Sequence, residues 1–266
     1  RQIQRIGHEV TSKYTRRCEI EYLNIARYIY SLVNAKAGKY MVFFPSHAFL
    51  ENVYRAFDNL YGEMEDMYLL AQRSYMKEDE REAFLDYFLN GEEVDFEGKI
   101  LMDVLVEEEG KEGTDIENEE MYRKREDILL AEEAAESRSG TIIGFCVLGG
   151  IFGEGIDLRN DSLIGAIIVG TGLPQVCPER EILKRHFEQT GEDGFDYAYK
   201  YPGMNKVLQA AGRVIRTAED VGIVALLDER FMQRGYRKMF PAEWQNIRPV
   251  TMENAGVMAA GFWERV

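Results

Sequence analysis

A chain of 266 residues is long enough for one α/β domain with an insertion. Its hydrophobic fraction of 45% describes a soluble globular protein, and its longest apolar runs are far too short to span a membrane. The net charge of −15 argues against a nucleic-acid-binding protein, but 18 acidic and 5 basic residues lie between Gly91 and Glu136, which leaves −2 for the rest. The remaining surface can therefore have a nucleic-acid partner.

The first predicted elements alternate between helix and strand. Apolar residues at helical spacing predict a helix over Glu21–Asn34, with Gly38 closing it. The continuous apolar run Tyr40–Phe44 is typical of a strand buried on both faces. Pro45 ends this strand, and the Ser46 hydroxyl is expected to cap the next helix.

Further along the chain the same patterns predict four more strands and three more helices. The strands are Met67–Ala71, Ile142–Leu148, Ala166–Gly170 and Gly222–Asp228, and the helices are Glu78–Leu89, Glu179–Gln189 and Val207–Thr217. Strands that alternate with helices indicate an α/β fold with a parallel sheet covered on both faces. Ligands in such folds bind at the carboxyl ends of the strands, and both the loop after Leu148 and the start of the Gln209 helix are candidates for that edge.

The acidic segment Gly91–Glu136 interrupts this alternation. A strand is suggested at Ile100–Val106 and a charged helix at Asn118–Ala135, but neither has many apolar residues to anchor it. Charge runs of this kind are usually solvated, so we expect an insertion on the domain surface.

One helix face gathers the residues best suited to an anion. In a helix over Val207–Thr217, Gln209, Arg213 and Arg216 fall on one face, and the apolar side chains fall on the other. Two aligned guanidinium groups repel each other, and a multiply charged anion such as a nucleoside triphosphate would explain their alignment. A solvated basic helix face is the alternative, and this pattern alone leaves both interpretations open.

A triphosphate also needs a phosphate cradle. The loop from Gly149 to Asp157 has glycines that let the backbone pass close to a ligand, but such loops are common after strands. The Gly-Lys pairs at Gly38, Gly98 and Gly110 lack the upstream glycine and the following hydroxyl of Gly-x-x-x-x-Gly-Lys-[Ser/Thr]. Whatever uses the arginines must therefore obtain its cradle elsewhere.

Other chemistries find no support in the sequence. The three histidines are isolated and the three cysteines lack metal-ligand spacing, so we expect no metal site and reduced thiols in a cytoplasmic protein. Gly-x-Ser-x-Gly is absent. The chain opens on Arg1 without a signal peptide, which predicts a piece of a longer protein.

Several motifs together resemble those of superfamily 2 helicases of the XPD/DinG group. Gly149-Gly-Ile-Phe-Gly-Glu-Gly-Ile-Asp-Leu is similar to motif V, and Gln209-Ala-Ala-Gly-Arg-Val-Ile-Arg is similar to motif VI. Four shorter matches run in the family's order: Lys13-Tyr-x-x-Arg17, Phe43-Phe-Pro-Ser46, Gly172-Leu-Pro174 with Ile182-Leu-Lys184, and Asp228-Glu-Arg-Phe231. The resemblance covers roughly Lys13 to Trp244, apart from the acidic segment.

The resemblance implies the second RecA-like motor domain of a 5′–3′ DNA helicase, with a mostly parallel sheet and helices on both faces. ATP and Mg²⁺ would be shared with a first RecA-like domain, which is absent from this chain together with any iron–sulfur cluster that the parent protein has. The partners would be that domain and single-stranded DNA, with no membrane. By the same match, Arg213 and Arg216 would be arginine fingers, and Gln209 would couple them to the nucleotide site. The residues that match the nucleotide-binding positions are Gly153, Glu154, Gly155, Asp157 and Gly212, and those expected along the DNA are Ser46 and His47.

Two rival functions remain open at this point. One is the RecA-like half of a nuclease-linked translocase, because a nuclease could lie outside this chain. The other is a RecA-like scaffold without motor function, although the intact Gln-x-x-Gly-Arg-x-x-Arg argues against it.

Overall fold

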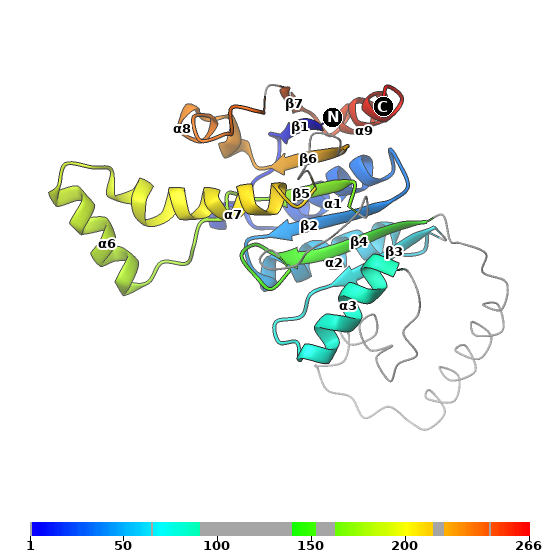
Figure 1. Cartoon of the computed structure of the whole chain (residues 1–266), viewed down its shortest axis with the longest axis horizontal. Helices are drawn as coiled ribbons and strands as arrows, with labels where there is room; N and C mark the ends of the chain where they lie inside the picture. Colours follow the sequence, from blue (N-terminus) through cyan, green and yellow to red (C-terminus); the bar gives the residue numbers. More distant parts are fainter. Residues whose placement is uncertain (1, 65, 91–139, 153–162, 215–220, 245) are drawn as a thin grey trace.

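The computed structural model describes residues 2–64, 66–90, 140–152, 163–214, 221–244 and 246–266. These residues form a seven-stranded sheet in which every neighbouring pair is parallel, in the order β3-β4-β2-β5-β6-β1-β7 (Figure 1). The strands are β1 (Gln2–Gly7), β2 (Lys39–Phe44), β3 (Met67–Ala71), β4 (Thr141–Val147), β5 (Gly165–Val169), β6 (Gly222–Leu227) and β7 (Ile247–Val250). The α/β class and the parallel sheet predicted from the sequence are confirmed.

Helices cover both faces of the sheet. The α-helices are α1 (Glu19–Val33), α2 (His47–Tyr61), α3 (Glu78–Asn90), α6 (Pro178–Gln189), α7 (Tyr201–Ala211), α8 (Arg234–Arg237) and α9 (Ala255–Trp263). The described residues also form two short 3₁₀ turns, η1 (Tyr14–Arg16) and η4 (Glu229–Met232), and a π-helical turn, η3 (Asp196–Lys200). Among the described helices, none is both long and apolar enough to cross a membrane.

Alternate side chains of each strand supply two separate cores. Tyr40, Val42 and Phe44 of β2 pack with α1, α2 and α9, whereas Met41 and Phe43 pack with α3 and α7. All five side chains are almost completely buried. A strand covered on both faces has no polar side to show, which is why this sequence reads as a continuous apolar run.

The five predicted strands that fall on described residues all exist, each within one residue of its expected bounds. Ser46 caps α2 as predicted, because its hydroxyl accepts a hydrogen bond from the Phe49 amide at 3.3 Å. The role predicted for Gly38 is wrong: α1 ends at Val33 with Asn34 as its cap, and Gly38, at φ +155°, leads the chain into β2. The predicted strand Ile100–Val106 and helix Asn118–Ala135 lie outside the described residues.

The helix predicted over Val207–Thr217 has different ends. α7 begins earlier, at Tyr201, where Pro202 fits the first turn because a helix start leaves its backbone N–H groups free. It stops at Ala211, with Gly212 as its cap and Arg213 in the following turn. A glycine inside a helix costs about 1 kcal/mol relative to alanine, whereas at a helix end the same residue is well tolerated.

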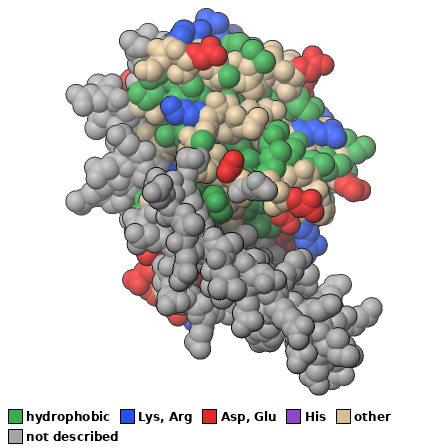
Figure 2. Space-filling model, turned by 90° about the vertical axis from the view of Figure 1, so that its right-hand side faces the viewer, with side chains coloured by type: hydrophobic (Ala, Val, Ile, Leu, Met, Phe, Trp, Pro, Cys, Tyr) green, Lys and Arg blue, Asp and Glu red, His purple; other side chains and the backbone are tan. Residues whose placement is uncertain are grey.

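Charges of both signs lie on one visible face of the described surface. Figure 2, which views the molecule from the right-hand side of Figure 1, shows acidic and basic side chains interspersed with hydrophobic ones. This mixture agrees with the nearly balanced charge of the sequence outside Gly91–Glu136.

Candidate functional site

The seven described strands are all parallel, so the loops that follow them meet at one edge of the sheet. After β2, Ser46 caps α2 and His47 is its first residue. His47 is half-buried, and its Nδ1 atom has no hydrogen-bond partner among the described residues. Ser46 and His47, the residues expected along the DNA, therefore both lie at the carboxyl edge of the sheet.

The loop after β4 begins close to α7. Gly149 has φ +69°, and a Cβ atom there would lie 2.8 Å from Cε of Lys206. The Val147 amide, one residue before the loop, donates to Oε1 of Gln72 at 2.9 Å. These contacts hold the start of the glycine-rich loop between α7 and the end of β3. Its remaining candidate residues, Gly153, Glu154, Gly155 and Asp157, lie outside the described residues.

The loop after β5 supports the first turn of α7. Gly172 has φ +65°, and a Cβ atom there would lie 2.6 Å from the carbonyl oxygen of Gly203. Two glycines are therefore required for this close approach. The helix that carries Gln209 does start at the carboxyl edge, but it starts at Tyr201, six residues before the predicted Val207, so Gln209 itself lies toward the other end.

The other end of α7 carries the motif VI residues. Gln209 and Gly212 are exposed and Arg213 is half-buried in contact with other residues, whereas Val207 and Val214 are buried. The predicted separation of polar and apolar faces is thus confirmed for these positions, and Arg216 lies outside the described residues.

The two groups of candidate residues lie at opposite ends of α7. Val214 packs over Gly222, the first residue of β6, so Arg213 is near the amino edge of the sheet rather than beside Ser46. The reason is the crossover: a helix that starts at the carboxyl end of β5 must return the chain to the amino end of the parallel strand β6. An eleven-residue helix spans about 16 Å. The expectation that the nucleotide and DNA loops are neighbours therefore does not apply to Arg213 and Ser46.

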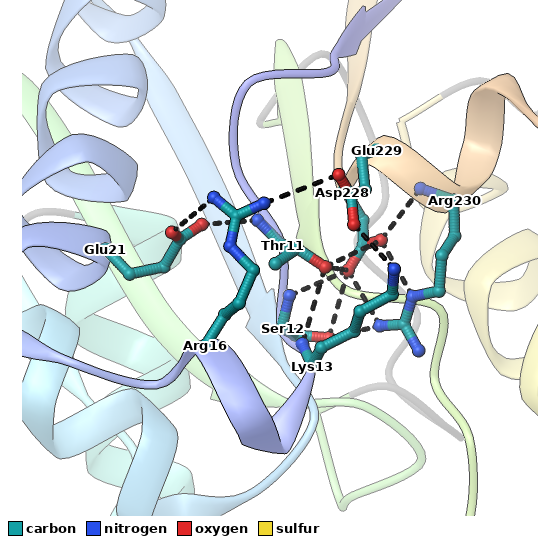
Figure 3. Close-up of polar contacts among 8 residues, drawn as sticks. All are labelled: Thr11, Ser12, Lys13, Arg16, Glu21, Asp228, Glu229 and Arg230. Atoms are coloured by element: carbon teal, nitrogen blue, oxygen red, sulfur yellow. Dashed lines mark hydrogen bonds and ion pairs between the residues drawn. The ribbon is translucent and has the colours of Figure 1, made fainter.

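A polar network that the sequence did not predict joins the ends of β1 and β6 (Figure 3). The carboxylate of Asp228 is fully buried and accepts hydrogen bonds from the Ser12 amide at 2.8 Å and the Ser12 hydroxyl at 3.1 Å. The Arg230 guanidinium donates to the same carboxylate through Nε at 2.8 Å and Nη2 at 2.7 Å. Burial opposes the charge of Asp228, but these hydrogen bonds and the charge of Arg230 prevail and hold its pKa below the usual value.

Three ion pairs extend the network toward α1. Lys13 Nζ lies 2.6 Å from Glu229, and Arg16 lies 3.4 Å from Glu229 and 3.1 Å from Glu21. Glu21 also accepts a hydrogen bond from the Thr11 amide at 2.5 Å. The segment from Thr11 to Arg16 is consequently fixed at both ends (Figure 3).

Gln209 and Arg213 carry side-chain donors of the kinds that bind phosphate groups. An amide and a guanidinium are neutral and positive donors, and the exposed Gln209 and Gly212 leave this end of α7 open. Asp228 does not offer a comparable place for a cation, because Arg230 already neutralises it. Within the described ranges, no three His, Cys, Asp or Glu side chains come together in a way that could hold a metal ion.

The sequence is similar to curated helicases over part of its length. It is 33% identical to the ATP-dependent DNA helicase YoaA of Escherichia coli over 94 residues, 34% of this chain and 14% of that protein. It is 36% identical to the ATP-dependent DNA helicase DinG of Photobacterium profundum over 91 residues, 34% of this chain and 13% of that protein. A probable ATP-dependent helicase of Methanocaldococcus jannaschii is 31% identical over 129 residues, 44% of this chain and 20% of that protein. The chain thus spans about a fifth or less of the length of these relatives.

Solved XPD structures share the fold. An XPD helicase superposes on 94% of this chain and 35% of its own with a TM-score of 0.56 at 20% identity. A structure of XPD in its apo form covers 94% of this chain and 40% of its own with a TM-score of 0.57, also at 20% identity. The fold is therefore the α/β fold of a RecA-like domain, as predicted. The family model for the helicase C-terminal domain matches residues 29–124 and 101–247, and the chain belongs to this family as the C-terminal motor domain of an XPD/DinG-type helicase.

Proposed function

We propose that the chain is the second motor domain of an ATP-dependent helicase that moves 5′ to 3′ on single-stranded DNA. The observation that carries the proposal is the family match, which extends through residue 247 and so includes the Gln-x-x-Gly-Arg-x-x-Arg segment beginning at Gln209. The curated relatives are named as ATP-dependent DNA helicases, which supports the same activity for the parent protein.

In this proposal Arg213 and Arg216 are arginine fingers. Phosphoryl transfer depends mainly on positioning and charge stabilisation, and one arginine supplied across a domain boundary is worth about 10³–10⁵ in rate. An arginine on the second domain makes hydrolysis depend on closure of the cleft, which ties chemistry to movement. Gln209, which is exposed and lies four residues before Arg213, would couple the arginines to the nucleotide.

The cradle for the nucleotide would come from a first RecA-like domain of the same polypeptide. ATP with Mg²⁺ supplies the γ-phosphate whose transfer to water drives movement. From this chain, Gly212 and the motif V residues Gly153, Glu154, Gly155 and Asp157 would border the nucleotide. The absence of Gly-x-x-x-x-Gly-Lys-[Ser/Thr] from the sequence supports a nucleotide site that is shared between the two domains.

The DNA track would cross the carboxyl edge of the sheet near Ser46 and His47. Phosphates of a single strand can be held by hydroxyls, amides and isolated basic residues, so no large basic patch is needed. α7 would then connect the two ligands, because its first turn packs on the loop at Gly172 and its last turn leads into Arg213. The acidic segment Gly91–Glu136 would be a surface insertion without a part in this cycle.

A comparison of ATP turnover by this chain and by its parent tests the proposal. The chain alone should bind ATP poorly and hydrolyse none, whereas the parent should show DNA-stimulated hydrolysis and should unwind a duplex with a 5′ tail. DNA-stimulated hydrolysis by the purified chain, after contaminating ATPases are excluded, would contradict the division of the site between two domains. Unwinding from a 3′ tail alone would contradict the polarity.

A further inference from the structure

The turn at Tyr14–Arg16 presents an aromatic ring that packs into neither core of the fold. We propose that Tyr14 and Arg17 form a contact for single-stranded nucleic acid, with a base stacked on the Tyr14 ring and a phosphate bound by the Arg17 guanidinium. This inference deepens the proposed function, because it adds a defined contact to the strand that passes Ser46 and His47.

The backbone that carries Tyr14 is fixed by its neighbours, although Tyr14 itself is 82% exposed. The residues around it are fixed one by one: Ser12 by the buried carboxylate of Asp228, Lys13 by Glu229, and Arg16 by Glu21 and Glu229. A 3₁₀ turn closes beneath the ring through a hydrogen bond from the Arg17 amide to the Tyr14 carbonyl at 3.3 Å. A binding surface that is already ordered in the free protein loses little conformational entropy when the ligand binds.

The Arg17 guanidinium lies between two aromatic rings. Its Cζ is 5.4 Å from the centre of the Tyr14 ring and 5.1 Å from that of Phe49, and its Nε donates to the Ser12 carbonyl at 3.3 Å. No carboxylate of the described chain forms an ion pair with Arg17, in contrast to Lys13 and Arg16. The positive charge of Arg17 is therefore available to an external anion, and one ring face supports it in a fixed place.

The position of this pair matches the proposed DNA track. Phe49, which packs against Arg17, lies in the first turn of α2, three residues after Ser46. Arg17 thus bridges the segment after β1 and the helix start that carries His47. An exposed ring beside an arginine without an ion-pair partner is suited to single-stranded nucleic acid. Any base can stack on the ring, and the phosphate next to that base can bind the arginine.

Direct binding to the 266-residue chain tests this contact. The probe is a fluorescein-labelled oligothymidylate, and anisotropy is measured over a series of salt concentrations. Tyr14→Ala should weaken binding about tenfold, and Tyr14→Trp should restore it, because base–aromatic stacking is worth about 1–3 kcal/mol per base. Arg17→Ala should reduce the salt slope by about 0.7, the amount expected for one phosphate contact on a single strand.

Tyr75→Ala is the matched control, since Tyr75 is 80% exposed and has no cation on its ring among the described residues. This variant should bind the oligonucleotide as tightly as the unsubstituted 266-residue chain does. Equal losses in Tyr14→Ala and Tyr75→Ala would overturn the proposal, as would an unchanged salt slope in Arg17→Ala. Melting curves of Tyr14→Ala and Tyr75→Ala should coincide with that of the unmodified chain, because both residues are exposed.

His47→Ala separates failure of this inference from failure of the proposed function. Ser46→Ala is less informative, because loss of the α2 cap alone destabilises a helix by about 1 kcal/mol. If His47→Ala weakens binding and the Tyr14 and Arg17 variants do not, the DNA track stands and the Tyr14–Arg17 contact is wrong. If the oligonucleotide does not bind even at low salt, both are wrong for this chain, and specific binding of a peptide instead would make the Tyr14 surface a protein-docking site.

Discussion

Asp228 and Arg230 form a two-point ion pair, with Nε to Oδ1 at 2.8 Å and Nη2 to Oδ2 at 2.7 Å. The carboxylate also binds Ser12, 216 residues away in the sequence, and Arg230 Nη2 donates to the Ser12 hydroxyl at 2.7 Å. One buried acid therefore connects the loop after β6 to the segment after β1. Both the core of the domain and the proposed Tyr14–Arg17 contact depend on this connection.

Asp228→Asn should lower the free energy of unfolding by about 3 kcal/mol, because it leaves the guanidinium of Arg230 without its buried counter-charge. The measurement is urea unfolding at neutral pH, with Asp66→Asn at an exposed position as the control. An effect no larger than that of the control would show that the pair contributes little.

The same residue should govern part of the stability at low pH. Since folding lowers the pKa of Asp228, its contribution is present above the unfolded pKa of about 3.9 and is lost as the pH falls through the lower folded value. Between pH 5 and pH 3, the free energy of unfolding of the unsubstituted chain should therefore fall more steeply than that of Asp228→Asn. Parallel pH profiles would contradict the assignment.

Gly172→Ala should destabilise the chain by more than Gly191→Ala. Both glycines have positive φ, +65° and +85°, so both variants carry the backbone cost of about 1 kcal/mol. At Gly172 the new Cβ would also meet the Gly203 carbonyl at 2.6 Å, whereas nothing lies within 4 Å at Gly191. Thermal unfolding of the two variants checks the difference, and equal melting temperatures would mean that the start of α7 can move away from the loop.

Replacement of residues 91–136 by a short linker should leave the melting temperature within a few degrees. The segment has 18 acidic residues and little apolar area to offset the entropy of ordering. A large loss of stability would instead show that Ile100–Val106 and Leu129-Leu130 belong to the core.

The sequence predicted the strands that are buried on both faces, because an uninterrupted apolar run has few other interpretations. It did not predict β1, in which Gln4 and Arg5 are almost completely buried. The Arg5 guanidinium donates through Nη1 to the carbonyls of Gln4 at 3.0 Å and Asn246 at 3.4 Å, while its buried Nε has no hydrogen-bond partner among the described residues. A polar strand of this kind depends on partners that are distant in the sequence, so local pattern cannot identify it. β7 and α9, at the end of the chain, were likewise not predicted.

The candidate site, like the fold, could be predicted from the sequence only in part. The motif V and motif VI segments were sufficient to indicate the helicase family, which the family match confirms. The acid directly after β6 was a local signal for Asp228, but its partner Ser12 could not be deduced across 216 residues. The distance of Arg213 from the carboxyl edge follows from the crossover through α7, which becomes visible only when strand order is known.

The central claim is that Arg213 and Arg216 act on ATP, and steady-state ATP turnover by the full-length parent with saturating single-stranded DNA tests it most directly. Arg213→Ala and Arg216→Ala should each reduce turnover by about 10³-fold or more while melting stays within a few degrees. Arg185→Ala, on the exposed helix α6, should leave both properties unchanged. If either arginine variant unfolds yet keeps the specific activity of its folded fraction, the arginines are structural and the account is wrong.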